Sequence, residues 1–247
     1  MPVQPSAGDW HLVILAAGRG QRFAGAVPKM LAPVRCGQGL LELLLKALLV
    51  EHHWPAAQIS VVGAGPALPA LRQLLHECGG GLQLHALAGG GSRGPLHSLA
   101  AALQDQRALA GNPNQPCWVL HADTFYPRTL LQLLLAQPPA AQPLVVVEPA
   151  KQGEALEVGV ALNESGQVLA LGPGRGWGWR MLPAVGWPPS LFPELLEPAR
   201  QHWSQWQLLK ALLASHSAQA LISTGSGVFD VDTLADHQRA RQRLQST

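Results

Sequence analysis

"VILAAGRGQRF" (residues 13–23) passes directly from an apolar run into small residues, glycines and arginines. A short run that is apolar on both faces is typical of a buried parallel strand. In open parallel sheets, ligands bind beyond the carboxyl ends of the strands, which is where this turn lies. Its small residues predict unobstructed backbone amides at Ala16, Ala17, Gly18 and Gly20, and such amides together with guanidinium groups favour an anion. The stretch therefore predicts a phosphate-binding turn after the first strand.

The same alternation of strand and helix continues up to about residue 150. Further short apolar runs occupy residues 59–63, 82–87, 117–122 and 143–148, and segments with apolar residues at helical spacing lie between them. The runs are expected to be buried parallel strands. Strand, helix, strand repeated along the chain predicts a three-layer α/β/α domain with a mostly parallel central sheet and right-handed crossovers.

After residue 150 the pattern changes. "LEVGVALNESGQVLALG" predicts two strands joined by a turn at "NESG", which is a hairpin. A segment rich in Gly, Pro and Trp follows, and then two helices near 190–200 and 203–215, a strand at "ALIST" and a helix from about residue 233. Thr233 and Asp236 resemble a capping box at the start of that helix. We expect a single domain over residues 1–247, with the hairpin as an elaboration of its second half.

The composition excludes several classes of protein. The chain has 247 residues, of which 47% are hydrophobic, so it can bury a substantial core. Charged residues make up 13% and the net charge is +2, which predicts no nucleic-acid partner. Cys36, Cys78 and Cys117 are odd in number and far apart, which argues against a disulfide framework or a cysteine metal site. The first residues lack a signal-peptide pattern, and Glu42 and Lys46 interrupt the most apolar segment, so we expect a cytoplasmic protein with no membrane partner.

Other interpretations of the opening turn can be weighed from the residues. A Rossmann dinucleotide fingerprint needs glycine at the last position of G-x-G-x-x-G, where this chain has Phe23, and a long loop precedes the next helix. A P-loop is excluded because no G-K-[ST] follows. A glycine turn with a purely structural role remains an alternative.

Two separated blocks give the chain a resemblance to a known family. "LAAGRGQRF" (15–23) and "PKMLAPV" (28–34) resemble the L-A-A-G-x-G-x-R-[MF] … P-K-x-L signature of nucleotidyltransferases of the sugar-phosphate, phosphocholine and molybdopterin-cofactor types. The resemblance implies a Rossmann-like, nucleotide-diphospho-sugar transferase-like fold. It also implies Mg²⁺-dependent transfer of NMP from an NTP to a phosphorylated small-molecule acceptor, with release of pyrophosphate. Arg22 and Lys29 would then be catalytic, holding the departing pyrophosphate. The residues implied in nucleotide binding at this turn are Leu15, Ala16, Ala17, Gly18, Arg19 and Gly20.

Carboxylates beyond two strands are the candidates for holding Mg²⁺, which takes oxygen ligands. "CWVLHADTFYP" places Asp123 just past an apolar strand, at the same sheet edge as the opening turn. In "GVFDVDTLADHQRA", Asp230 and Asp232 alternate along an extended segment, so both side chains face one side. The resemblance implies that Asp123 and Asp232 are metal ligands and that Asp230 is a supporting carboxylate. The alternative is that Asp123 caps a helix and Asp230 is merely exposed.

A glycine-rich loop and its helix, "GGGSRGPLHSLAAAL", form a third block. Glycines let a flat base approach the backbone closely. The resemblance implies that this block reads the base and helps to hold the ribose, through Gly89, Gly90, Gly94, His97 and Ser98. For His97, a structural role on the helix is the alternative.

The acceptor is expected to bind over the second half. By the resemblance, residues 1–150 form the nucleotide-binding half, and residues 151–247 form the acceptor-binding half with the metal-ligand segment. "LGPGRGWGWR" lacks the lysine that meets the acceptor phosphate in the sugar-phosphate enzymes, and Arg175 or Arg180 could replace it. Five tryptophans gather in this region, either as a cage for a quaternary ammonium, which would favour phosphocholine, or as core residues. They are Trp177, Trp179, Trp187, Trp203 and Trp206.

Two further interpretations of the whole chain stay open. A molybdopterin-type guanylyl- or cytidylyltransferase would share the first half and differ in its acceptor. A nucleotide-binding sensor that has lost catalysis would keep the phosphate-binding turn but would not convert substrate to product. Neither base nor acceptor follows from the sequence, which also allows a homo-oligomer.

Overall fold

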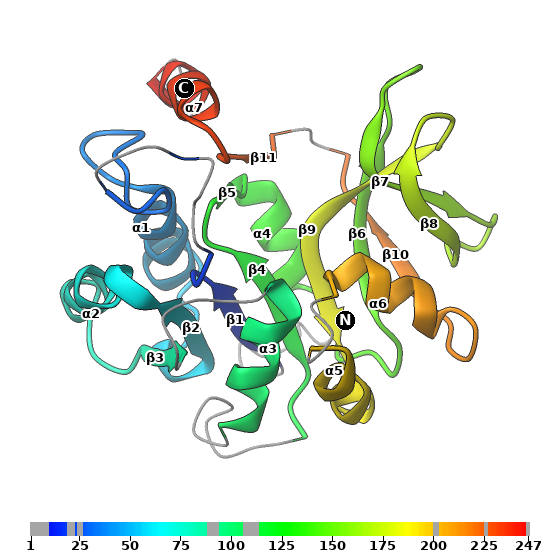
Figure 1. Cartoon of the computed structure of the whole chain (residues 1–247), viewed down its shortest axis with the longest axis horizontal. Coiled ribbons are helices and arrows are strands. Elements are labelled where there is room, and N and C mark those ends of the chain that lie inside the picture. Colours follow the sequence, from blue (N-terminus) through cyan, green and yellow to red (C-terminus); the bar gives the residue numbers. More distant parts are fainter. Residues whose placement is uncertain are drawn as a thin grey trace, which may run out of the picture.

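A single mixed β-sheet forms the centre of the molecule, with the strand order β10-β6-β9-β4-β1-β2-β3 (Figure 1). The structure is a computed structural model that describes residues 10–18, 23, 27–87, 94–105, 114–199, 203–224 and 227–245. The strands of the sheet are β1 (His11–Leu15), β2 (Ile59–Ala64), β3 (Gln83–Leu87), β4 (Cys117–His121), β6 (Leu144–Pro149), β7 (Leu156–Leu162), β8 (Val168–Gly174), β9 (Trp179–Trp187) and β10 (Gln219–Ile222). A separate small ribbon pairs β5 (Thr124–Phe125) with β11 (Phe229–Asp230).

Four of the six neighbouring pairs along this strand order run parallel, which confirms the predicted α/β class. β1 pairs in parallel with β2 and β4, β2 with β3, and β6 with β10. The run at residues 143–148 forms the buried strand β6, which points in the same direction as β4 as expected, but the two are not neighbours because β9 lies antiparallel between them. After β6 the chain passes through the β7–β8 hairpin and returns as β9 through the middle of the sheet. That pairing is long-range, so local apolar patterning cannot reveal it.

Helices cover both faces of the sheet. One face carries α3 (Pro95–Gln104), α5 (Phe192–Ala199) and α6 (Gln205–Leu212). The other carries α1 (Leu40–Lys46), α2 (Leu68–Glu77) and α4 (Arg128–Leu135). α7 (Leu234–Gln245) lies beside β11, at the edge of the molecule (Figure 1). Shorter helical turns are η1 (Ala47–Glu51, π-helical), η2 (Ala56–Gln58), η3 (Gly65–Ala67) and η5 (Pro189–Leu191). Within the described ranges, none of these helices combines the length and apolar character needed to cross a bilayer.

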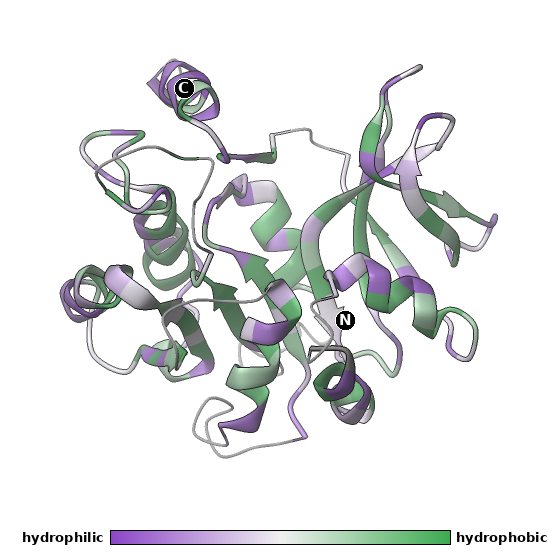
Figure 2. Cartoon of the chain, in the orientation of Figure 1, coloured by the Kyte–Doolittle hydropathy of each residue, from purple (hydrophilic) through white to green (hydrophobic). Residues whose placement is uncertain are grey.

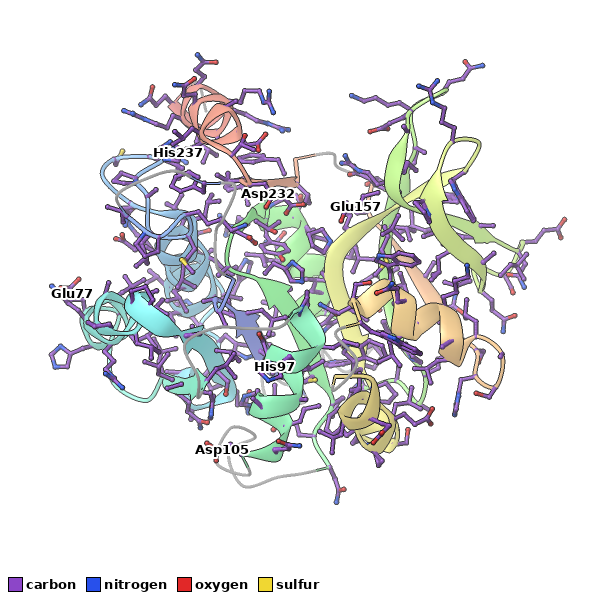
Figure 3. The ribbon with its side chains drawn as sticks, viewed as in Figure 1. Glu77, His97, Asp105, Glu157, Asp232 and His237 are labelled. Carbon is purple, nitrogen blue, oxygen red and sulfur yellow. The ribbon has the colours of Figure 1, made fainter. Side chains whose placement is uncertain are left out.

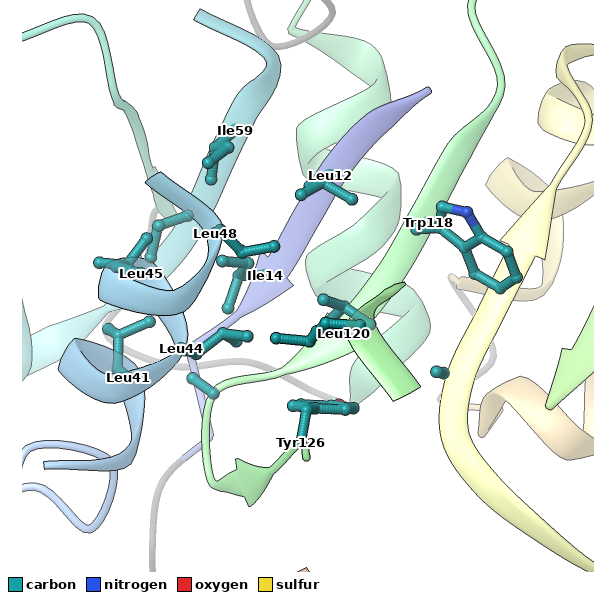
Figure 4. Packing of buried hydrophobic residues seen from close by; sticks show 14 of the residues in the cluster. Leu12, Ile14, Leu41, Leu44, Leu45, Leu48, Ile59, Trp118, Leu120 and Tyr126 are labelled. Carbon is teal, nitrogen blue, oxygen red and sulfur yellow. The ribbon is translucent and has the colours of Figure 1, made fainter. Parts of the chain in front are cut away.

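Alternating residues of the buried strands supply the two cores. Val13 packs into the α3 layer, whereas Leu12 and Ile14 pack into the α1 layer (Figure 4). Leu41 and Leu45 of α1 are 0% exposed, and burying each such leucine contributes about 1.5–3 kcal/mol. Figure 2 shows the result, with apolar strands at the centre and polar residues on the outer helix faces. The three-layer arrangement holds the carboxyl ends of β1 and β4 side by side.

The predicted hairpin is confirmed as β7–β8. Its turn is closed by Asn163, whose Oδ1 accepts hydrogen bonds from the backbone N–H of Ser165 (3.1 Å) and of Gln167 (2.8 Å). Gly166 has a φ of +77°, a left-handed conformation that favours glycine.

Candidate active site

The opening turn begins one residue later than predicted. The N–H of Ala16 donates to the Val62 carbonyl (2.8 Å), and the N–H of Ala122 donates to the Leu15 carbonyl (3.0 Å). The expectation of an unobstructed amide at Ala16 is therefore wrong, because the sheet extends past β1 and uses that donor. Ala16 and Ala17 are 2% and 3% exposed, whereas Gly18 is exposed and a Cβ there would meet nothing within 4 Å. The predicted binding residues Arg19, Gly20 and Arg22 lie outside the described residues.

A lysine lies between the two aspartates that were predicted to hold a metal. Lys29 forms an ion pair with Asp123, and its Nζ lies 2.9 Å from Oδ1 of Asp232. The Lys29 side chain is 10% exposed. Burial alone would lower the pKa of Lys29, but the charges and hydrogen bonds of Asp123 and Asp232 outweigh it and raise that pKa. The structure thus brings together residues from three predicted blocks, and we call Lys29, Asp123 and Asp232 the charged cluster.

Pairing between β5 and β11 brings the two aspartates together. The N–H of Val231 donates to the carbonyl of Asp123 (3.0 Å), next to the two-residue antiparallel ribbon. Within that ribbon Phe125 stacks on Phe229 at 5.1 Å between ring centroids. Asp232 follows immediately, at the start of the chain segment that leads into α7 (Figure 3). Segments from the middle and the end of the sequence therefore share one edge of the sheet.

Helix α7 anchors this segment from the other side. Asp236 Oδ2 accepts the N–H of Thr233 (2.8 Å), and Thr233 Oγ1 accepts the N–H of Asp236 (3.2 Å), which confirms the predicted capping box. Ala240 and Leu244 of α7 join a third apolar cluster that contains Phe23. The ring of His237 also meets Phe23 edge-on at 5.7 Å (Figure 3 labels His237). The C-terminal helix thereby fixes the backbone that carries Asp232.

Asp230 takes no part in the ion pairs of Lys29. One of its carboxylate oxygens, Oδ1, accepts a hydrogen bond from the Thr124 hydroxyl. Crowding by protein atoms raises the pKa of Asp230, and the negative charges of Asp123 and Asp232 raise it further, although the Thr124 hydrogen bond acts against them. Asp230 therefore lies beside the charged cluster and outside its ion pairs.

The donor set of the charged cluster has the chemistry that Mg²⁺ prefers. Oxygens of Asp123 and Asp232 converge on one point, which the Lys29 ammonium fills. Two carboxylates are a common protein contribution to a Mg²⁺ site that takes its other ligands from water and phosphate. Among the described residues, no group of three or more His, Cys, Asp or Glu side chains is placed to hold a metal ion.

The predicted base-reading block is only partly described. Gly94 precedes α3 with a φ of +143°, which favours glycine, whereas Gly89 and Gly90 lie outside the described residues. Ser98 is 2% exposed and packs inward. His97 is half-buried on the same helix (Figure 3). Their roles in nucleotide binding stay predictions.

A cavity of about 540 Å³ adjoins the charged cluster. Asp123, Asp230 and Asp232 line it together with Pro95 of α3 and residues of the second half. Several lining residues had no signal in the sequence, because they belong to no motif and meet only through the fold. They are Glu154, Glu157, Ser204 and Gln205.

Tyr126 joins the two strands beneath this cavity. Its hydroxyl accepts the N–H of His121 (2.7 Å) and donates to the Pro183 carbonyl (2.8 Å). The pKa of Tyr126 is raised well above its ordinary value by burial, so the hydroxyl stays protonated as this bridge requires. The end of β4 is thus fastened to β9.

Of the two arginines considered for the acceptor, Arg180 lines the cavity and Arg175 is exposed. Arg180 forms an ion pair with the buried Glu148, and its Nη1 lies 3.9 Å from Oε1 of Glu154. Its charge is therefore already balanced by protein carboxylates.

The tryptophans do not form a cage. Trp187 is 0% exposed in the core, and Trp179 and Trp203 pack partly buried against the same core. Trp177 covers Gly159, where a Cβ would lie 2.0 Å from Trp177 Cγ. Of the five, Trp206 alone is among the described residues that line the cavity. The core interpretation is confirmed for Trp187, and the five-membered cage is wrong because four of the rings pack in or against one core cluster and only Trp206 of the five is a described lining residue of the cavity.

Comparison with solved structures places this fold among known ones. The CTP:phosphocholine cytidylyltransferase from Streptococcus pneumoniae has a TM-score of 0.70 at 14% identity, over 95% of this chain and 98% of that one. A candidate glucose-1-phosphate thymidylyltransferase from Bacillus anthracis has a TM-score of 0.74 at 14% identity, over 96% of both chains. The inositol-1-phosphate CTP transferase from T. maritima has a TM-score of 0.72 at 13% identity, over 95% and 94%. At such identities the likeness establishes the fold.

The sequence itself establishes the family. No curated protein matches the chain significantly. Residues 12–225, however, match the family described as the MobA-like NTP transferase domain, and this range includes the opening turn, Lys29 and Asp123. The chain therefore belongs to the MobA-like NTP transferase family and is a nucleotidyltransferase.

Proposed function

We propose that the protein transfers a nucleoside monophosphate from an NTP to a phosphorylated small-molecule acceptor and releases pyrophosphate, with Mg²⁺ held by Asp123 and Asp232. The observation that carries this proposal is the charged cluster at the carboxyl ends of β1 and β4. There a buried lysine and two converging carboxylates lie beside a cavity large enough for an acceptor. Catalysis of phosphoryl chemistry consists mainly of positioning and charge neutralisation, which is what such a cluster provides.

The remaining requirements of the reaction are an ionised nucleophile, positive charge near the leaving group and space for the phosphates. A phosphate oxygen of the acceptor is already ionised near pH 7, so its attack on the α-phosphorus needs no strong general base. Lys29 stays protonated at neutral pH and can meet negative charge that develops on the departing pyrophosphate. The exposed Gly18, where a Cβ would meet nothing within 4 Å, leaves room for a phosphate group close to the backbone. Bound between the carboxylates, Mg²⁺ would supply further neutralisation of the triphosphate.

The test is a pyrophosphate-release assay with each of the four NTPs, Mg²⁺ and a panel of phosphorylated acceptors. Lys29→Met and Asp123→Asn are expected to lose on the order of 10²–10³ in turnover. Matched controls are Lys46→Met and Glu164→Gln, which change exposed residues of α1 and of the hairpin turn. Turnover of Asp123→Asn at the wild-type rate would place the site elsewhere. A wild-type protein that is stabilised by NTP but releases no pyrophosphate with any acceptor would favour the nucleotide sensor instead.

A further inference from the structure

The charge of the cavity restricts the acceptor that the proposed function requires. The described residues that line it include the guanidinium of Arg180 and five carboxylates, those of Asp123, Asp230, Asp232, Glu154 and Glu157. A phosphorylated acceptor brings further negative charge into this space. At the end nearest β1, Lys29 and the proposed metal offset the phosphate. The remaining carboxylates of the lining need a separate explanation.

Among the described residues, the two basic side chains at or beside the cavity are both engaged by protein carboxylates. Lys29 is held by Asp123 and Asp232. Arg180 is held by Glu148 and is directed towards Glu154.

Glu157 is an exposed carboxylate among the residues that line the cavity. It projects from β7, and no ion-pair partner for it occurs among the residues that the structure describes. Figure 3 shows Glu157 and Asp232 near the same edge of the molecule, on the β7 side and the β11 side. A ligand that spans the cavity thus meets a carboxylate at each side.

The first turn of α6 adds an aromatic ring and a polar group to the lining of the same cavity. Trp206 is half-buried and lines the cavity. Gln205 also lines it and is 6% exposed; its Nε2 lies 3.0 Å from His121 Nε2, and its Oε1 has no hydrogen-bond partner among the described residues. Ser204 caps this turn through reciprocal hydrogen bonds with Gln207, so both side chains start from a fixed backbone. A carboxylate and an indole face together are the groups that bind an organic cation.

We propose that the acceptor carries an ammonium group in addition to its phosphate, and that Glu157 and Trp206, which line the same cavity, recognise this group. The inference rests on the proposed function and names its substrate class, a phosphorylated amino alcohol rather than a neutral sugar phosphate. A primary ammonium could also donate a hydrogen bond to the open acceptor of Gln205, whereas a quaternary one could not.

The test compares ligands that differ only in charge. Binding to the full chain with Mg²⁺ and a non-cleavable NTP analogue is measured by calorimetry for phosphoethanolamine and for propyl phosphate, in which a methyl replaces the ammonium. A second arm uses phosphocholine and its neutral isostere 3,3-dimethylbutyl phosphate. In at least one arm the cationic ligand is expected to bind about tenfold more tightly than its isostere. The arm that shows the larger ratio distinguishes a primary from a quaternary ammonium.

The variant Glu157→Gln separates the carboxylate from the rest of the cavity. It is expected to weaken binding of the cationic ligand about fivefold and to leave the neutral isostere unchanged, while Glu164→Gln changes neither. Equal binding of cationic and neutral ligands in both arms, or tighter binding of glucose 1-phosphate, would overturn the inference. A cation preference in binding without pyrophosphate release from any NTP would count against the proposed function and leave the cation site standing.

Discussion

Replacing Lys29 with methionine removes the positive charge between Asp123 and Asp232 and leaves two carboxylates facing one another. Breaking a fully buried pair costs about 3–5 kcal/mol. Here the aspartate side chains keep 23% and 37% of their surface exposed, so solvent screens part of the repulsion. We therefore expect a loss of about 1–2 kcal/mol in the free energy of unfolding. For a domain of this size that corresponds to a fall in Tm of about 2–8 °C.

The pH dependence of this loss follows from the direction of the pKa shift. Burial alone would lower the pKa of Lys29, but its two carboxylates raise it above the ordinary value of 10.5. The folded state thus binds this proton more tightly than the unfolded chain does. The stabilisation is fully present below the ordinary pKa and is lost only as the pH rises through the higher folded-state value. The difference between wild type and Lys29→Met should accordingly stay constant across neutral pH.

Thermal unfolding with and without MgCl₂ is the assay, with Lys46→Met as the matched control. Mg²⁺ should raise the Tm of Lys29→Met more than that of wild type, because its two carboxylates no longer hold an ammonium. A variant that melts like wild type and does not respond to Mg²⁺ would refute the description of the cluster as a cation site.

Three other predictions concern stability. Burial, together with the charge of a neighbouring histidine, lowers the pKa of His11 from 6.5 to about 4. The free energy of unfolding should therefore fall by on the order of 3 kcal/mol as the pH drops from 6.5 to 4. In acid titrations of the unfolding free energy, His11→Gln should abolish that fall. Burial alone would raise the pKa of Asp236, but its hydrogen bonds with Thr233 and Arg239 together outweigh burial and lower that pKa. Asp236→Ala should therefore cost about 1 kcal/mol in urea unfolding at neutral pH and less as the pH falls through the folded-state pKa. Gly159→Ala should displace Trp177, costing about 1–3 kcal/mol and altering tryptophan fluorescence, whereas Gly178→Ala, where a Cβ meets nothing within 4 Å, should do neither.

The fold was predictable wherever its determinants are local. The strands β1, β2 and β4 are short apolar runs buried on both faces, β3 is a partly exposed edge strand, and each of the four coincides with a predicted run to within two residues. The hairpin turn at Asn163 and the cap at Thr233 likewise follow from neighbouring residues. The position of β9 depends instead on pairing with β4 and β6 across the chain. Sequence periodicity does not indicate which strands become neighbours in the sheet.

The residues of the site that lie in sequence motifs were predictable, and those outside the motifs were not. Asp123 and Asp232 could be placed at a strand end and on an extended segment, and both reach Lys29. The contact of His121 with Gln205 joins residues 84 positions apart, and Gln205 has no motif that marks it. The same holds for Glu157, whose position in the cavity depends on how the β7–β8 hairpin packs against β9.

The hydrogen bond between Lys29 and Asp232 closes a loop of 203 residues. Closing a loop of that length is entropically unfavourable, so such a contact belongs late in the folding of the chain. An interaction that is absent from the transition state changes the rate of unfolding and leaves the rate of refolding almost untouched. Loss of Lys29 should therefore shorten the lifetime of the native molecule without slowing its formation.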